Sequence, residues 1–327
     1  MTREVLVTGA NGFVGSHICE ALLENGFSVR ALVRKTSNLV NLKCLNINLI
    51  YGDITDPDSL PAAVDGVYAI VNNAGIVKTN CREQFHTVNC GGTENVLKAA
   101  LEYNAGLTRF VHVSSTAACG PAPSMAPIDE EFPANPLTAY GRSKLNAERA
   151  VQGVKNDLPV TILRPSAIYG PRDTEMFSFF KSIRMRIKPA FGPGQRYLNF
   201  TYVKDFARIV VRAIETKTPS GGIYIVAEKS PHSYSEAADI IARLLGNGTI
   251  TLYVPGAILN LAGLVSETFA RWRDKPSIFT QEKVREIVQR YWIFDTSRVQ
   301  RDFGFVSTDF ETGAGETIAW YKENGWL

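Results

Sequence analysis

The chain has 327 residues, of which 45% are hydrophobic and 20% charged, and this composition indicates a globular protein with a sizeable core. The net charge of +3 is mild and the Lys and Arg residues are spread along the chain, so we predict no nucleic-acid partner. The five cysteines form no Cys-x-x-Cys pair and there are only four histidines, which argues against a zinc site and favours a reduced, cytoplasmic protein.

The opening of the chain predicts a strand, a glycine turn and a helix. Residues 5–8 form a short buried run, Gly9, Gly12 and Gly15 follow it, and residues 16–25 have the pattern of an amphipathic helix. A helix start attracts anions through its free N–H groups and its dipole, and glycine lets a pyrophosphate approach the backbone. Alone, this spacing predicts a phosphate site. The first strand begins so early that we expect no signal peptide.

Strands and helices alternate through the first half of the chain. The further predicted strands are 27–33, 47–51, 67–72, 108–113 and 160–163, and the predicted helices are 84–103 and 138–154. Continuous Val, Ile and Leu runs indicate parallel strands covered on both faces, so we predict an α/β fold of the Rossmann type, a doubly wound parallel sheet.

The second half of the chain is less regular. We predict a helix at 202–214, a strand at 222–226, a mostly helical last hundred residues and a short strand at 291–294. The longest apolar run, residues 254–265, is too short to span a membrane and is expected to be a helix of the lobe. We assign residues 1–165 and about 201–227 to a dinucleotide-binding domain, and about 166–200 and 228–327 to a smaller, mostly helical lobe that binds substrate.

The tip of the second strand indicates which dinucleotide is bound. Arg34 lies 19 residues after Gly15, where this fold meets the adenosine ribose, and no Asp or Glu occurs from residue 29 to 49. An acid would suit the 2′-hydroxyl of NAD, whereas an arginine suits the 2′-phosphate of NADP. We therefore predict NADP, with Arg34 as the phosphate clamp and Lys35 beside it, although a solvated basic turn is the alternative. Asp53, after the third strand, could accept a hydrogen bond from the adenine.

A tyrosine and a lysine one helical turn apart predict a proton-transfer site. Tyr140 and Lys144 share one face of the predicted helix, although this spacing also arises by accident. A phenol with a pKa of about 10 is a poor base at neutral pH, but a nearby ammonium and a cationic nicotinamide would stabilise its phenolate. Tyr140 could then exchange a proton with an alcohol or a carbonyl, while Ser115, at the end of the fifth strand, orients the substrate oxygen.

Together these motifs resemble the extended short-chain dehydrogenase/reductase family, also called the NAD-dependent epimerase/dehydratase family. The resemblance covers nearly the whole chain, and its arginine-tipped second strand looks most like the branch of the dihydroflavonol reductases and 3β-hydroxysteroid dehydrogenases. The matching segments are Thr8–Gly15, Gly52–Asp53, Asn72–Gly75, Val88–Thr93, Val113–Ser115, Tyr140 with Lys144, Leu163–Pro171, Tyr202–Asp205 and Trp320–Tyr321.

The resemblance implies a role for each matching residue. Ser115 would bind the substrate oxygen, Tyr140 would act as general acid and base, and Lys144 would hold the nicotinamide ribose and lower the pKa of Tyr140. Asn89 would position a water or the lysine, or else be a buried structural amide. The cofactor contacts would be Gly9, Asn11, Gly12, Phe13, Val14, Gly15, Arg34, Lys35, Asp53, Ile54, Asn73, Ala74, Gly75, Tyr140, Lys144, Pro165 and Ile168, with no metal.

Departures from the family's motifs narrow the choice of reaction. Thr116 and Ala117 replace the acidic pair with which the sugar-nucleotide 4,6-dehydratases perform elimination. Leu198 stands where nucleotide-sugar epimerases have an arginine that grips phosphates, and Cys119 replaces a tyrosine that contacts sugars in many relatives. Both differences disfavour a sugar-nucleotide substrate.

The insertion at residues 176–200 carries many aromatic and basic side chains. Its apolar members are Met176, Phe177, Phe179, Phe180, Met185, Phe191 and Phe200. As a group they favour a pocket for a hydrophobic substrate, although packing of the lobe explains some of them. The basic members Arg184, Arg186, Lys188 and Arg196 could bind an acidic group or form a solvated helix face.

We therefore predict an NADP(H)-preferring oxidoreductase that interconverts a secondary alcohol and a ketone or aldehyde on a small, rather hydrophobic substrate. A nucleotide-sugar epimerase that uses NAD and a non-catalytic NADP-binding regulator are the alternatives, and NAD is possible as the cofactor. A regulator need not keep Ser115, Tyr140 and Lys144 together. From the resemblance alone we also expect a homodimer through the helices 84–103 and 138–154.

Overall fold

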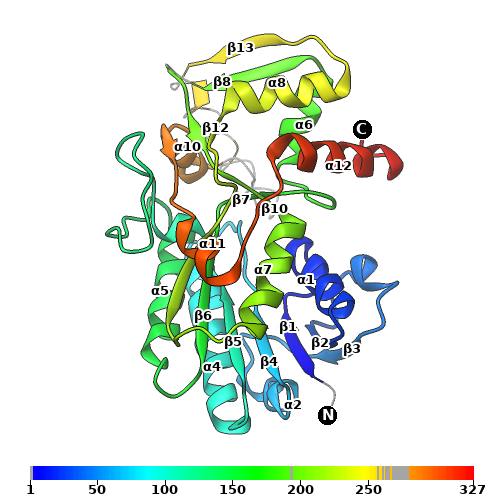
Figure 1. Ribbon diagram of the computed structural model, residues 1–327, viewed down its shortest axis with the longest axis vertical. Helices are drawn as coiled ribbons and strands as arrows, with labels where there is room; N and C mark the ends of the chain where they lie inside the picture. Colours follow the sequence, from blue (N-terminus) through cyan, green and yellow to red (C-terminus); the bar gives the residue numbers. More distant parts are fainter. Residues whose placement is uncertain (1–2, 192–193, 256–257, 260, 262–265, 267–279) are drawn as a thin grey trace.

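A seven-stranded parallel sheet forms the lower half of the molecule in this computed structural model, which describes residues 3–191, 194–255, 258–259, 261, 266 and 280–327 (Figure 1). Its strand order is β11-β6-β5-β4-β1-β2-β3. The strands are β1 (Glu4–Thr8), β2 (Ser28–Val33), β3 (Asn48–Tyr51), β4 (Ala69–Asn72), β5 (Arg109–Val113), β6 (Val160–Pro165) and β11 (Gly222–Val226). This order confirms the predicted doubly wound α/β sheet, whose winding reverses between β1 and β4.

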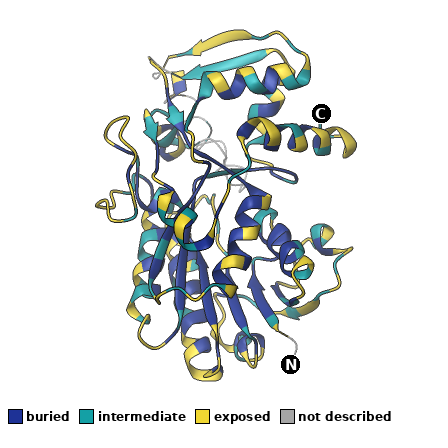
Figure 2. Cartoon of the chain, viewed as in Figure 1, coloured by how far each residue is buried: buried dark blue, intermediate teal, exposed yellow. Residues whose placement is uncertain are grey.

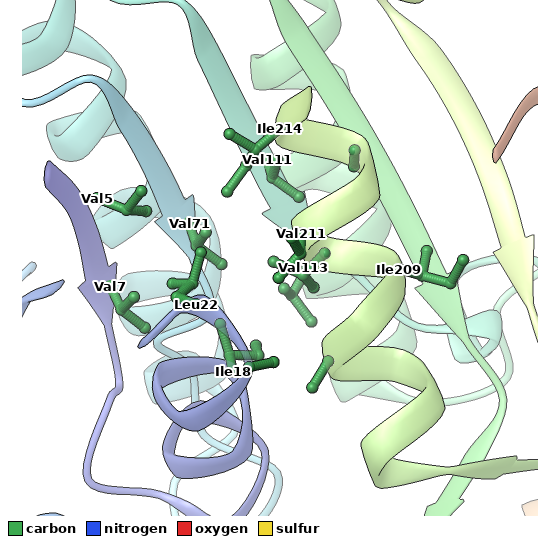
Figure 3. Close-up of a cluster of buried hydrophobic side chains, with 14 of the residues drawn as sticks. Val5, Val7, Ile18, Leu22, Val71, Val111, Val113, Ile209, Val211 and Ile214 are labelled. Carbon is green, nitrogen blue, oxygen red and sulfur yellow. The ribbon is translucent and has the colours of Figure 1, made fainter. Parts of the chain in front are cut away.

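Helices cover both faces of the sheet. One face carries α1 (Phe13–Glu24) and α7 (Val203–Glu215), and the other carries α2 (Pro61–Val64), α4 (Gly92–Tyr103) and α5 (Ala139–Gly153). Val5 and Val7 point to the α1 and α7 side, where Figure 3 shows them near Ile18 of α1, whereas Leu6 points to the other side. Successive strand residues are therefore all buried, which explains the unbroken hydrophobic runs in the sequence (Figure 2).

The second part of the chain builds a lobe above the carboxyl ends of the strands (Figure 1). Its helices are α6 (Phe177–Arg184), α8 (Tyr234–Leu245), α10 (Gln281–Ile287) and α12 (Phe310–Glu323), and α6, α8 and α12 share one apolar cluster. Its short strands pair as β7 (Ala167–Tyr169) with β10 (Phe200–Tyr202), β8 (Ile187–Phe191) with β13 (Ile250–Val254), and β9 (Tyr197–Leu198) with both β12 (His232–Ser233) and β14 (Tyr291–Trp292). The lobe thus contains more strand than we predicted.

Three further differences from the sequence prediction concern helices. Helix α1 begins at Phe13 rather than at residue 16, because Gly15 lies inside the first helical turn. The predicted helix 84–103 is interrupted: a short α3 (Glu83–Phe85) leads into a π-helical stretch, η3 (His86–Gly91), before α4. Helix α11 (Ser297–Phe303), which we assigned to the lobe, packs against the large sheet through Val299 and Phe303.

The remaining short helices are the 3₁₀ turns η1 (Val40–Leu42), η2 (Pro57–Ser59) and η4 (Thr116–Ala118). The helix expected at 254–265 lies mostly outside the described residues. Within the described part of the chain, no helix combines the length and apolar character needed to cross a membrane.

Candidate active site

A cleft of about 1520 Å³ lies between the carboxyl ends of the sheet strands and the lobe. Pockets for a single small molecule are typically about 300–1,000 Å³, so this cleft has room for a dinucleotide and a second molecule. Of the residues that the sequence predicted for the site, all line the cleft except Gly15, Lys35 and Asn89.

The turn between β1 and α1 forms one end of the cleft. Gly9 has a φ of +66°, and a Cβ on Gly15 would lie 2.1 Å from the carbonyl oxygen of Gly9, so both positions need glycine. Gly12 is the N-cap of α1, and neither a side-chain cap nor an acidic residue occupies the first turn. The first N–H groups of the helix therefore remain open to an anion, which fits the pyrophosphate of a dinucleotide. Gly15 does not line the cleft but permits the turn that does.

A buried hydrogen-bond network fixes the loop after β4 against this turn. The Thr8 hydroxyl donates to Asn72 Oδ1 (2.9 Å) and accepts from the backbone N–H groups of Asn73 (3.0 Å) and Ala74 (2.9 Å). Asn72 in turn donates to Thr93 Oγ1 on α4 (3.0 Å). Asn73 and Ala74 line the cleft, so the network sets the shape of its floor.

The adenosine end of the cleft lies at the tips of β2 and β3. The Arg34 side chain is exposed and lines the cleft, and its backbone N–H donates to Ser37 Oγ (3.1 Å). Ser37 also lines the cleft and was missed from the sequence, although Ser at a basic turn is a usable phosphate ligand. Lys35 is exposed outside the lining, so the structure does not place it with Arg34. Asp53 lines the cleft while its carboxylate accepts from Thr55.

The predicted catalytic groups meet near the middle of the cleft. Ser115 follows β5, and its hydroxyl caps the turn η4 by accepting from Ala117 N–H (3.1 Å). Tyr140 lies in the first turn of α5, which begins there because Thr138 is an N-cap whose hydroxyl accepts from Gly141 N–H (3.1 Å). Burial raises the pKa of the Tyr140 phenol well above its usual range, while a hydrogen bond with Ser115 acts in the opposite direction.

Lys144 is fully inside the protein, one turn beyond Tyr140. Its Nζ donates to the carbonyl oxygen of Val113 (2.9 Å), and burial lowers its pKa from 10.5 to about 8. We had predicted that this ammonium lowers the pKa of Tyr140. The structure shows instead a raised phenol pKa, to which Glu286 and Glu175 contribute through their charge. Lys144 is directed at the main chain, so the residues shown here do not by themselves prepare a phenolate.

Asn89 lies in the π-helical stretch and makes three side-chain hydrogen bonds. It accepts from Ile76 N–H (2.8 Å) and donates to Ile76 C=O (3.0 Å) and Ser143 Oγ (2.9 Å). These bonds tie the loop after β4 to helix α5. Asn89 does not line the cleft, and this geometry corresponds to a positioning amide that holds the cleft wall beside the catalytic helix.

A buried ion pair beneath the catalytic residues was not foreseen from the sequence. Arg164 of β6 binds Glu148 of α5 through two bonds, Nε to Oε1 (2.9 Å) and Nη2 to Oε2 (2.7 Å). Ser114, the neighbour of Ser115, donates to the same carboxylate (2.5 Å). Helix α5, β5 and β6 are therefore joined one turn below Lys144.

Helix α10 of the lobe holds the start of α5, and this too was not foreseen. Glu282 Oε2 accepts from Ala139 N–H (2.9 Å), and Glu286 Oε1 accepts from the Thr138 hydroxyl (3.0 Å). We call this pair of contacts the α10 clasp. A carboxylate at a helix N-terminus is favoured by the helix dipole, so the lobe stabilises the turn that carries Tyr140.

One part of the lobe wall is apolar, whereas Asp173, Glu175, Glu282, Lys283 and Glu286 line the cleft elsewhere in the lobe. Of the aromatic and methionine residues predicted to form it, Met176, Phe179 and Phe191 do line the cleft. Phe177, Phe180 and Phe200 pack instead in the lobe's core, and Met185 is exposed. Further lining residues are Val77, Phe85, Ile287, Tyr234, Trp292 and Leu198.

The four basic residues of the same insertion have different environments. Lys188 pairs with Asp239 (2.6 Å), and Arg184 and Arg186 are exposed outside the cleft lining. Arg196 alone of the four is buried and lines the cleft.

Comparison with known proteins shows the family of this chain. The model of the NAD dependent epimerase/dehydratase family matches residues 5–227. The chain is 28% identical over 330 residues to ceramide reductase of Caulobacter vibrioides (99% of this chain, 96% of that protein). It is 33% identical over 261 residues to 3 beta-hydroxysteroid dehydrogenase/Delta 5-->4-isomerase of Mycobacterium tuberculosis (74% and 69%). The crystal structure of gox2253 superposes with a TM-score of 0.84 at 28% identity and covers both chains completely.

Proposed function

Because the chain belongs to the NAD-dependent epimerase/dehydratase family, and is thus an NAD(P)-dependent dehydrogenase/reductase of the extended short-chain type, we propose that it reduces a ketone or aldehyde on a rather hydrophobic substrate with NADPH, or catalyses the reverse oxidation. The observation that carries the proposal is the meeting of Ser115, Tyr140 and Lys144 in a cleft with a glycine turn at one end and an apolar wall at the other.

The bound nicotinamide would supply the hydride for the substrate carbon. The Ser115 and Tyr140 hydroxyls would then bind the substrate oxygen, and Tyr140 would give it a proton during reduction. Its raised pKa suits this direction, because the phenol keeps its proton at neutral pH. Lys144 would move from the Val113 carbonyl toward the nicotinamide ribose, where its charge would favour the phenolate that remains.

We propose NADP rather than NAD as the preferred cofactor. The Arg34 side chain lines the cleft beside Ser37. A guanidinium and a hydroxyl suit a phosphate, whereas the 2′-hydroxyl of NAD is usually held by a carboxylate at this position.

A hydrophobic substrate is supported by the lobe wall and by two relatives. Met176, Phe179 and Phe191 line the cleft. The names of the relatives denote a reductase of ceramide and a dehydrogenase of a hydroxysteroid. Leu198 is buried in the lining where a nucleotide-sugar epimerase would have its phosphate-gripping arginine. This is why we prefer the reductase to the epimerase.

The test is turnover of a panel of apolar ketones, aldehydes and secondary alcohols with NADPH and NADH. Tyr140→Phe should lower kcat by about 10²–10⁴-fold while leaving NADPH binding intact. Tyr291→Phe is a matched control, because Tyr291 lies outside the cleft lining. A Tyr140→Phe enzyme with normal turnover would refute the mechanism. Epimerisation of a UDP-sugar with retained NAD would establish the epimerase, and NADPH binding without Tyr140-dependent turnover would indicate a regulator.

We also retain two proposals about organisation. We propose that residues 1–165 and about 201–227 form the dinucleotide-binding domain, to which α11 is added because it packs on the large sheet, and that the rest of the chain forms the substrate lobe. The homodimer would use α4 and α5, whose exposed positions include Leu101 and Tyr103.

A further inference from the structure

Arg196 is a buried cation that lines the lobe part of the cleft. It immediately precedes β9, and the residue is only 7% exposed. Its Nη1 donates to the Gly194 carbonyl (3.2 Å), but its buried Nε has no hydrogen-bond partner among the residues that the structure describes. No carboxylate within the described ranges lies at ion-pair distance from it. A buried guanidinium with an unused donor is costly unless something binds it.

A second guanidinium lies beside the same backbone. A Cβ added to Gly194 would be 3.1 Å from Nη2 of Arg290, so both arginines flank Gly194. Burial lowers the pKa of Arg196, and the charge of Arg290 lowers it further. Two positive charges are thus held close together, although neither charge stabilises the fold. Such an arrangement is a feature of binding sites.

The surroundings of Arg196 are aromatic. Its carbonyl accepts from Tyr234 N–H (3.0 Å), and the Tyr234 ring contacts Phe179 (centroids 5.7 Å apart) and Phe191 (6.2 Å). All three rings line the cleft with Arg196. The other cation in the lobe part of the lining, Lys283, is already paired with Glu286 (3.3 Å).

We propose that Arg196, supported by Arg290, binds a carboxylate or phosphate group at one end of an amphipathic substrate. The apolar part of that substrate would lie along Phe179, Phe191 and Tyr234. The reacting carbon would lie at Tyr140, and this last placement rests on the proposed reductase function. The fork of an arginine matches both oxyanions, and a charged hydrogen bond that excludes water is among the strongest in proteins. Arg196 would therefore select acidic substrates over neutral analogues of the same length.

The test measures binding rather than turnover. Calorimetric titration of the protein saturated with NADP would compare octanoate, octyl phosphate and 1-octanol. We expect at least one anion to bind about tenfold or more tightly than the alcohol. The ratio between the two anions distinguishes a carboxylate from a phosphate ligand. A wild-type protein that shows no preference for either anion overturns the proposal.

Variants assign the effect to the site. Arg196→Gln should abolish the preference, and Arg290→Gln, at an exposed residue, should reduce it. Arg184→Gln, an exposed arginine outside the cleft, should leave it unchanged. Retained preference in both Arg196→Gln and Arg290→Gln contradicts the assignment. Because this titration measures binding without turnover, a failed reductase function would appear in the kinetic assay of Tyr140→Phe without altering this result.

Discussion

The buried pair between Glu148 and Arg164 allows a quantitative prediction about stability. Both side chains are almost completely buried, at 3% and 5% exposure, and the carboxylate receives two guanidinium bonds and one from Ser114. Glu148→Gln would leave the Arg164 charge buried without a counter-charge. Breaking such a pair costs about 3–5 kcal/mol, which corresponds to a fall in Tm of roughly 4–7 °C for a chain of 327 residues.

The assay is urea denaturation followed by circular dichroism, with a surface pair as the internal control. Arg243 and Glu311 are joined at 2.8 Å, but their side chains are 64% and 51% exposed. Glu311→Gln should therefore cost no more than about 1 kcal/mol, because water already screens that pair.

A double substitution distinguishes the loss of the ion pair from the cost of leaving one charge buried alone. Glu148→Leu combined with Arg164→Met removes both charges, so it should restore much of the stability that Glu148→Gln loses. The reasoning fails if Glu148→Gln is no more damaging than Glu311→Gln.

The remaining predictions concern the cofactor, one titrating group and assembly. Arg34→Ala should lower kcat/KM with NADPH by about 10–100-fold and should change kcat/KM with NADH little. Lys35 lies outside the cleft lining, so an equal effect of Lys35→Ala would argue against Arg34 as the phosphate clamp. Lys144→Met should unfold at higher urea than the wild type at pH 7, because burial depresses the Lys144 pKa to about 8. In the wild type, Lys144 keeps its proton up to about pH 10.5 when unfolded but only up to about pH 8 when folded. The free energy of unfolding of the wild type should therefore rise between about pH 8 and 10.5, and the stability advantage of Lys144→Met should shrink. A constant difference in stability across that range would contradict the lowered pKa of Lys144. Light scattering after size-exclusion chromatography should give twice the chain mass of 36.0 kDa, and a monomer would refute the dimer.

The large sheet could be predicted because its signal is local. Val5, Leu6 and Val7 are buried on alternate faces of the sheet, so these three successive positions are all apolar. Most lobe strands gave no such signal, and only β14 (Tyr291–Trp292) lies where we predicted a lobe strand. Strand β8 contains Lys188 and Pro189, is only half-buried, and pairs with β13, about sixty residues further along the chain.

The candidate site also has one part that could be predicted from the sequence and another that could not. The glycine turn, Tyr140 and Lys144 stand in short motifs, and the structure brings them to one cleft. Their partners could not be predicted, because those contacts join distant segments. Val113, whose carbonyl binds Lys144, is 31 residues away from that lysine in the sequence. Glu282 is 143 residues away from Ala139, whose N–H donates to it at the start of α5. The π-helical turn around Asn89 was not predicted either, because we assigned residues 84–103 to a single regular helix.

The α10 clasp has a consequence for how this protein can be re-engineered. Glu282 accepts from the Ala139 N–H at the start of α5, and Glu286 accepts from the hydroxyl of its N-cap, Thr138. A chimera that took its lobe from a relative would therefore exchange the support of the proton donor together with the substrate wall. Specificity and proton transfer would thus change together when the lobe is exchanged, and a grafted lobe must bring both carboxylates at the same register to leave Tyr140 in place.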